Sequence, residues 1–310
     1  MIWSALKWVG YSVKNSIVRP KVLCSFLLLL ASLLTCGIFI VKTYADEDEE
    51  DARNNAIVVA NEVGSWFSTE LDKALLPLFT VAQFVQELEI FHDLPAIVKT
   101  APNQVGRDCE ICFKNVTSVV DQSVFDKFDE ISERIKRDAK MEKVLVNVQI
   151  APDAVVTALY PLINSEDFEP PTVMDNTGAQ GHDLLNDPKR VAIARATVPA
   201  DDVVMAGPLK LVQGGVPVVE ECMIARMPIK NIGNNTITID GIEYQCWGFA
   251  VILLNWAALK EKSGIYQRFQ RENMEFNMTR TDKIIADGIE FEKVNLLIVI
   301  ENFGFNFILL

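Results

Sequence analysis

The sequence is poor in the groups that most enzymes use. It has only 2 histidines in 310 residues, so acid–base chemistry through imidazole is scarcely supplied. It contains no GxSxG, HExxH, GxxxxGK[ST] or GxGxxG motif. Carboxylates are plentiful enough for a hydrolase with paired acids, but no pattern places two of them together. We therefore expect no enzyme activity, no cofactor and no metal in this chain.

Basic residues are also scarce. The 29 lysines and arginines are outnumbered by 42 acidic residues, and the formal net charge is −13. Binding to nucleic acid needs clustered cations that release counterions from phosphates, so we expect no nucleic-acid partner. Half of the residues are apolar, which is enough to bury a substantial core.

One long uncharged run stands near the N-terminus. Val22–Val41 has 20 residues without a charge, and a helix of this length spans the hydrocarbon core of about 30 Å. The sequence therefore predicts a transmembrane helix at 22–42. A cleaved signal peptide is the alternative, but the run is long for one and no compelling cleavage site precedes the acidic block at 46–51.

The charges on the two sides of this run predict its orientation. Residues 1–21 carry four basic residues and no acid, whereas 46–51 reads DEDEED. The positive-inside rule then leaves 1–21 in the cytoplasm and sends the rest outside, so we expect a single-pass membrane protein. Three glycosylation sequons are compatible with that location, at Asn115, Asn234 and Asn277.

Six cysteines are present, and two of them, Cys24 and Cys36, lie in the apolar run. The other four are disulfide candidates: Cys109, Cys112, Cys222 and Cys246. Three pairings are open, and proximity in sequence favours 109 with 112 and 222 with 246. The lone CxxC is an alternative redox or zinc motif, but no second CxxC or nearby histidine accompanies it.

Apolar residues recur at helical spacing over 52–94 and again over 124–140. The first segment predicts one long helix or a helix pair; it is too long for an ordinary globular helix, so we expect a stalk that follows the acidic spacer. Its apolar stripe fits two interpretations equally well: packing against its own domain, or a seam between two copies. Strict heptads are absent, so a regular coiled coil is not expected.

Beyond residue 141 the apolar period changes to two. The runs KVLVNVQIAP and VVTALYPL predict a hairpin, as do VVMAGPLKLVQ and VVEECMIARMPI around Gly214-Gly215. A third hairpin has Asp240-Gly241 at its tip. A loop at 164–178 separates these strands from a short helix whose expected N-cap is Asp187. The pattern predicts an α+β fold with antiparallel strands.

Six segments occur in an order and spacing that resemble the CHASE domain, an extracellular sensory module of receptor histidine kinases and nucleotide cyclases. They are Ala151-Pro152, VVTALYPL, GHDLL, AGPLKLVQGG, IARMPI and WGFAVILLNWAAL. The resemblance covers roughly residues 55–290. It implies two PAS-like antiparallel-sheet subdomains after a long helix, and a dimer. In plant members the membrane-distal subdomain binds adenine-type cytokinins.

The resemblance also implies a division of the chain. The expected parts are a cytoplasmic 1–21, a transmembrane 22–42, a spacer and stalk at 43–94, a sensory domain at 95–290, and a C-terminal strand or truncated end at 291–310. Within 95–290, the distal subdomain would cover 124–230 and the proximal one 231–290, with CWGFAVILL in the proximal part.

The ligand would then lie among residues of the distal subdomain. The candidates are Tyr160, Leu162, Asp183, Met205, Ala206 and Leu211. Four of them have a structural alternative: Tyr160 can pack on a strand, Met205 and Leu211 can belong to the core, and Asp183 can fix the turn that Gly181 marks. We expect His182, Gln213 and Arg226 to be exposed rather than to contact a ligand.

The sequence thus predicts a membrane-anchored domain that binds a small extracellular molecule and signals through paired stalks. A kinase or cyclase output domain would lie beyond this chain, which we expect to be incomplete because it ends abruptly on apolar residues. Two alternatives remain: a decoy, or a glycosylated adhesion protein without a small ligand.

Overall fold

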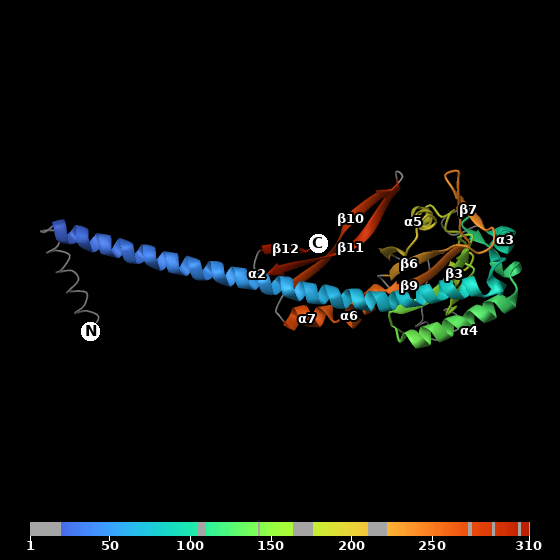
Figure 1. The fold of residues 1–310 in the computed structure, drawn as a ribbon, viewed down its shortest axis with the longest axis horizontal. Helices are drawn as coiled ribbons and strands as arrows, with labels where there is room; N and C mark the ends of the chain where they lie inside the picture. Colours follow the sequence, from blue (N-terminus) through green and yellow to red (C-terminus); the bar gives the residue numbers. More distant parts are fainter. Residues whose placement is uncertain are drawn as a thin grey trace. The chain divides into compact units, whose positions relative to one another are not determined.

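The computed structural model describes residues 20–104, 110–141, 143–163, 176–209, 222–271, 275–286, 289–302 and 305–309 (Figure 1). Two compact units are present, Met1–Val59 and Ala60–Leu310. The described helices are α2 (Pro20–Glu87), α3 (Leu94–Lys99), α4 (Gln122–Ala139), α5 (Val191–Thr197), α6 (Trp256–Lys262) and α7 (Ile265–Arg271), with 3-10 turns at Glu89–Phe91, Val116–Ser118 and Thr177–Ala179. The described strands are β1 (Asn103–Gln104), β2 (Phe113–Lys114), β3 (Leu145–Pro152), β4 (Ala158–Tyr160), β5 (Val204–Leu209), β6 (Cys222–Ile229), β7 (Thr236–Ile239), β8 (Ile242–Gln245), β9 (Gly248–Asn255), β10 (Glu275–Ala286), β11 (Ile289–Asn302) and β12 (Phe305–Leu309).

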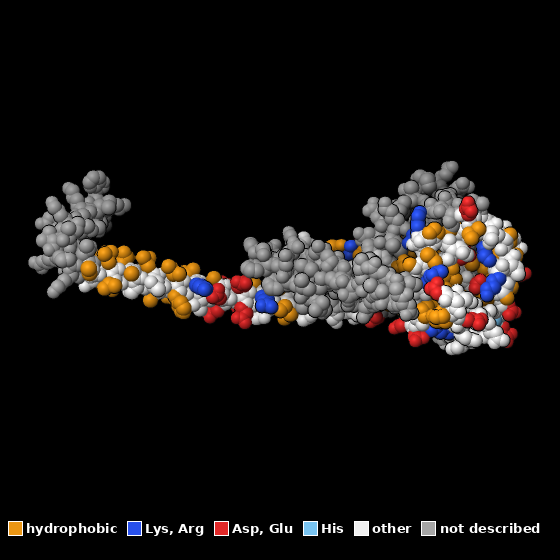
Figure 2. Space-filling view, turned by 90° about the horizontal axis from the view of Figure 1, so that it is seen from above, with side chains coloured by type: hydrophobic (Ala, Val, Ile, Leu, Met, Phe, Trp, Pro, Cys, Tyr) orange, Lys and Arg blue, Asp and Glu red, His pale blue; other side chains and the backbone are white. Residues whose placement is uncertain are grey.

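Helix α2 begins with the run expected to cross a membrane. An 18-residue window there has a mean hydropathy of 2.5, and its side chains are exposed. Figure 2 shows apolar side chains around this part of the helix, followed by a band of acidic ones. In length and composition the segment can span a bilayer, as predicted. The acidic run at 46–51 is part of the same helix.

The later part of α2 is amphipathic. Val63, Phe67, Leu78 and Val85 are buried on one side of it, at the three- and four-residue steps that the sequence shows. The helix ends at Glu87 instead of near residue 94, because Leu88 takes an extended backbone conformation with φ −100° and ψ 113°. The expected helix at 124–140 is present as α4.

A five-stranded antiparallel sheet forms the centre of the second unit, in the order β4-β3-β9-β6-β5. The expected pairing of β3 with β4 and of β5 with β6 is confirmed. The predicted turn at Gly214-Gly215 lies outside the described residues. The third hairpin is confirmed as β7–β8, with Asp240 and Gly241 at φ 49° and 82°, as a tight hairpin turn requires.

This sheet corrects the expected boundary at 230/231. Strand β9, which that boundary places in a proximal subdomain, pairs with β3 on one side and β6 on the other. A division at 230/231 would separate the central strand from both of its neighbours. The α+β class with small antiparallel sheets is confirmed. Residues 275–309 contain a further antiparallel sheet in the order β10-β11-β12.

The two faces of the five-stranded sheet have different coverings. On one face, core side chains of β3, β6 and β9 pack with α5, with the segment 176–187 and with the β7–β8 hairpin; the cluster includes Leu184, Ala194 and Ile237. On the other, α4 contacts β4. The side chains of alternate residues therefore enter two separate environments.

Candidate functional site

The register of the sheet places a polar row inside an apolar face. Gln149 of β3 lies opposite Val251 of β9, and Val251 lies opposite Arg226 of β6. Leu253 and Ile224 form the next row on the same face. Residues directly opposite on antiparallel strands have side chains on the same side, so all five project toward the segment 176–190.

Gly181 shapes the part of that segment which faces the sheet. Its φ of +83° lies in the left-handed region, and a Cβ at this position would come within 2.1 Å of the Lys114 carbonyl oxygen. Its amide donates to the Val156 carbonyl at 2.7 Å, and its carbonyl accepts from the Lys114 amide at 2.8 Å. The tight turn expected at Gly181 is confirmed. Its two hydrogen bonds connect Lys114 of β2 with Val156, which precedes β4.

His182 is buried, in contrast to the surface position we expected. Its ring stacks on Phe113 with centroids 5.0 Å apart, and its Nε2 lies 2.7 Å from Asp187 Oδ2. Burial lowers the pKa of His182 more strongly than Asp187 raises it. The ring is therefore neutral at pH 7, and with Nε2 protonated it donates to the Asp187 carboxylate.

Asp187 is not the N-cap of the following helix. Its Oδ1 accepts from the Lys189 amide at 2.8 Å and its carbonyl accepts from the Arg190 amide at 3.0 Å, which closes a turn. Helix α5 begins at Val191 with Arg190 as its N-cap. The prediction of a helix starting directly after Asp187 is therefore wrong, and the turn brings the Arg190 side chain over the sheet.

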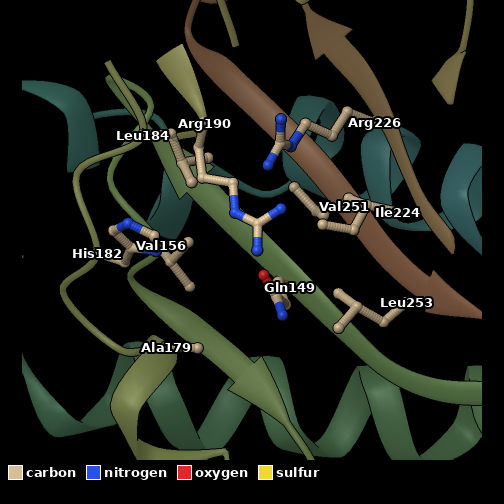
Figure 3. Close-up of a pocket in the computed structure, with 10 residues that line it drawn as sticks. All are labelled: Gln149, Val156, Ala179, His182, Leu184, Arg190, Ile224, Arg226, Val251 and Leu253. Carbon is tan, nitrogen blue, oxygen red and sulfur yellow. The ribbon is translucent and has the colours of Figure 1, made fainter. Parts of the chain in front are cut away.

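A half-enclosed pocket of about 40 Å³ lies between the sheet face and this segment. Ten residues line it: Gln149, Val156, Ala179, His182, Leu184, Arg190, Ile224, Arg226, Val251 and Leu253. Figure 3 shows the Arg190 guanidinium reaching down toward Gln149, with the Arg226 guanidinium pointing in from the strand beside it. Six of the ten residues are aliphatic, so the polar groups are concentrated in a mainly apolar wall.

Arg226 is the most unusual of these residues. It is only 2% exposed, whereas we expected it on the surface, and its Nε and Nη1 have no hydrogen-bond partner among the described residues. Burial and the nearby Arg190 lower the pKa of Arg226 to about 10, so the group stays charged at neutral pH. Burial also lowers the pKa of Arg190. The guanidinium groups of Arg226 and Arg190 thus bring positive charge into a part of the pocket wall that water hardly reaches.

The residues predicted to bind a ligand do not gather here. Tyr160 and Met205 lie on the opposite face of the sheet, at the two ends of one row that crosses β4, β3, β9, β6 and β5. Four strand spacings separate them, about 19 Å. Tyr160 faces α4, where burial and Glu133 raise its pKa. These two residues therefore cannot share a small ligand at this sheet.

The other four candidates lie in different places, and none of them lines the pocket among the described residues. Ala206 is on the pocket face but does not line the pocket. Leu162 is 49% exposed. Asp183 is buried and accepts hydrogen bonds from the Leu185 and Asn186 amides and from Asn186 Nδ2, so its carboxylate has the structural role. Leu211 lies outside the described residues, as does Gln213.

Sequence reasoning missed Gln149, Arg190 and Arg226 as a group. A signal for Arg226 was present, because it follows Ile224 at the two-residue period of a buried strand and interrupts an apolar run. Gln149 carries the same signal in KVLVNVQIAP. The apolar residues Val144, Val146, Val148 and Ile150 share one side of that predicted strand, and Gln149 lies on the other side. Their meeting depends on strand order, which the period alone does not specify.

The cysteines of the sheet region do not pair as expected. Cys222 and Cys246 are buried free thiols, so the pairing of 222 with 246 is wrong. Cys222 lies at the end of the sheet where β6 pairs with Asn255, and Cys246 precedes β9 at the other end, about 24 Å away along the strand. Burial raises their pKa values to about 12 and about 11.

Cys112 is disulfide-bonded, and its expected partner Cys109 lies outside the described residues. Among the sequons, Asn234 is in an exposed turn, while the Asn115 Oδ1 accepts from Thr117 Oγ1 at 2.9 Å. Asn277 belongs to β10.

Comparisons with protein-family models, with curated proteins and with solved structures found no match to this chain.

Proposed function

We propose that this chain is a membrane-anchored sensory domain of the CHASE-like kind, which binds a small molecule in the pocket above the five-stranded sheet. The bulk of the chain would be extracellular and 1–21 cytoplasmic. One observation carries the proposal: the strand that forms the pocket wall leads directly to a contact with α2. The same helix contains the segment that can cross a membrane.

The contact can be followed residue by residue. Val251 and Leu253 of β9 line the pocket, and β9 ends at Asn255, whose side chain caps α6 by accepting from the Ala258 amide at 3.0 Å. The next residue, Trp256, meets Phe67 of α2 edge to face with ring centroids 5.3 Å apart. A displacement of β9 by a ligand would therefore act on the buried side of α2.

Two polar contacts support the same connection. Arg268 of α7 forms an ion pair with Glu62 of α2 at 2.8 Å. At the other end of β9, the buried Trp247 donates its indole N–H to the Phe91 carbonyl, just after α2, at 2.9 Å. Strand β9 is thus linked to the α2 region at both of its ends. A small displacement of β9 would therefore be transmitted to α2 or to the residues just after it through both contacts.

In this mechanism the ligand selects one of two arrangements of β9, α6 and α2. A ligand shifts such an equilibrium only by its difference in affinity for the two states. Paired stalks in a homodimer would carry the displacement toward an output domain outside this chain. The pocket residues bind and position the ligand, and we propose no catalytic role for them.

The test uses the full chain in detergent micelles and a library of adenines, amino acids, short peptides and organic acids. A compound at about 100 times its dissociation constant stabilises the folded state by about 2.7 kcal/mol, which thermal unfolding detects. Hydrogen exchange is then measured with and without that compound. We expect changed protection in residues 60–87 of α2 as well as in β9.

Two outcomes would count against the proposal. If no compound stabilises a folded preparation, adhesion or a decoy role replaces ligand sensing. If a compound stabilises the chain but leaves the exchange of 60–87 unchanged, the pocket binds without signalling through α2.

A further inference from the structure

A second and larger cavity is separate from the pocket above the sheet. It has a volume of about 480 Å³ and lies between the turn 140–144, which joins α4 to β3, and the helices α6 and α7. Cavities that hold small organic molecules usually measure about 300–1,000 Å³, so this one is large enough for such a ligand. The described residues that line the two sites do not overlap.

The cavity has an apolar floor. Met141 and Val144 are buried, and both line it together with Ala258 of α6. Backbone hydrogen bonds hold this floor in place: the Val144 amide donates to the Met141 carbonyl at 2.9 Å, and the Asn255 amide donates to the Val144 carbonyl at 2.7 Å. The floor therefore offers a fixed aliphatic surface to the apolar part of a ligand.

The rim of the cavity is rich in ammonium groups. Lys140, Lys143 and Lys262 line it, in a chain whose formal net charge is −13. The side chains of Lys140 and Lys143 form no ion pair and donate no hydrogen bond within the part of the chain that the structure describes. These two ammonium groups are therefore available to a ligand.

Lys262 combines a structural contact with a remaining donor. Its Nζ donates to the Lys140 carbonyl at 3.1 Å and lies 2.8 Å from Met141 Sδ. These contacts connect the end of α6 to the turn that follows α4. An ammonium has three N–H groups, so one of them remains for a ligand in the cavity.

The type of cation narrows the choice of anion. A lysine ammonium is a compact charge with rotatable donors, whereas an arginine offers the planar fork that matches a carboxylate. Among the described residues, three lysines and no arginine line the cavity. A phosphate monoester has three terminal oxygens that point in different directions, and it carries a charge of about −1.5 to −2 at pH 7. It can therefore accept hydrogen bonds from ammonium groups on two different elements.

We propose that this cavity binds an organic phosphate monoester. The phosphate would lie on Lys140, Lys143 and Lys262, and the apolar part of the molecule would lie on Met141 and Val144. Such a ligand bridges α6 and the turn 140–144, which are held together in its absence by the contacts of the Lys262 ammonium.

The position of the cavity gives this ligand a role in signalling. Helix α6 contacts Phe67 of α2 through Trp256, and α7 contacts Glu62 of α2 through Arg268. A phosphate monoester that fixes α6 against the turn 140–144 would favour one arrangement of these contacts. This consequence rests on the proposed sensory function, whereas the binding site itself does not.

The test is calorimetric titration of the full chain in non-ionic detergent micelles with sodium phenyl phosphate. Sodium benzoate, which has the same ring with a carboxylate, and sodium sulfate at equal ionic strength are the controls. We expect saturable binding of phenyl phosphate that is about tenfold tighter than binding of benzoate, because the phosphate adds charge and an acceptor oxygen. Equal affinities for the three salts would show an adventitious ion only and would overturn the proposal, as would the absence of binding.

Lys143→Gln removes one ammonium group from the rim. We expect the affinity for phenyl phosphate to fall about two- to fivefold, as for one exposed charge pair, and about tenfold when Lys140→Gln is added. The matched control is Lys127→Gln, which removes the same charge about 20 Å away from Lys140 along α4, where Lys127 pairs with Glu130. This control should leave the binding nearly unchanged.

Glu261→Gln gives a test of the opposite sign. The Glu261 carboxylate lines the same rim and repels an anion there, so we expect this variant to bind phenyl phosphate about two- to fivefold more tightly. Unchanged affinity in both Lys143→Gln and Glu261→Gln would overturn the site.

Hydrogen exchange of residues 60–87 distinguishes this site from the broader proposal. Binding that the lysine variants weaken, together with unchanged exchange of 60–87, would support the phosphate site and exclude its role in signalling. If no library compound stabilises the chain, sensing in the pocket above the sheet fails, while the phenyl phosphate titration still decides this site.

Discussion

At the scale of single residues, Gly181 determines whether the pocket segment can approach β2. We predict that Gly181→Ala destabilises the folded state by at least about 2 kcal/mol, because left-handed backbone costs a side chain about 1–2 kcal/mol and the new Cβ would overlap the Lys114 carbonyl. Denaturant unfolding measures this. Gly178→Ala is the matched control, since a Cβ there meets nothing within 4 Å. Equal stability of the two variants would contradict the prediction.

His182 should make stability depend on pH. Burial lowers the pKa of His182 below its usual value near 6.5, so the unfolded chain binds a proton that the folded protein excludes. Its contribution is therefore fully present above about pH 6.5 and declines as the pH falls toward the folded-state pKa, by at most about 1.4 kcal/mol per pH unit. Unfolding at several values between pH 5 and 7 tests this.

His182→Gln keeps a hydrogen-bonding side chain without this titration. We expect its stability to change less between pH 7 and pH 5 than that of the original chain. An equally steep decline in both proteins would mean that other groups produce the acid sensitivity.

At the scale of elements, the exposed side of α2 carries apolar side chains that the fold does not use. Trp66, Leu76 and Phe79 are 43%, 62% and 41% exposed. If this side pairs two copies of the chain, Leu76→Glu should convert dimers to monomers, because a buried unpaired charge costs several kcal/mol. Light scattering of the micellar protein measures the mass.

The matched control for this experiment is Ile242→Glu, which places the same charge on an exposed aliphatic position of the β7–β8 hairpin. It should leave the mass unchanged. A monomeric original chain, or a dimer that survives Leu76→Glu, would exclude this side of α2 as the seam.

At the scale of the whole molecule, the orientation in the membrane is open to a direct test. In a glycosylating host we expect Asn234, in its exposed turn, to carry a glycan if the second unit is outside the cytoplasm. Asn234→Gln should then remove one discrete step of mass that a glycosidase also removes. A chain with no glycan at any sequon would argue for the opposite orientation.

The local elements were largely predictable because their causes are local. The uncharged run at 22–41, the helix at 124–140 and the Asp240-Gly241 hairpin each follow from the period of apolar residues or from a turn dipeptide. The predicted end of α2 and the predicted start of α5 were wrong. In both cases the backbone is set by single residues, Leu88 and Asp187, whose conformation and hydrogen bonds the period does not reveal.

The sequence by itself determined the apolar helix, the antiparallel strands and the scarcity of catalytic groups, since composition and periodicity act within a few residues. Only the tertiary structure decided that β9 is the central strand, that Tyr160 and Met205 face away from the pocket, and that Arg226 is buried beside Arg190. The physical reason is register: the face on which a strand residue lies, and what lies opposite, depend on pairing between segments that are far apart in the chain.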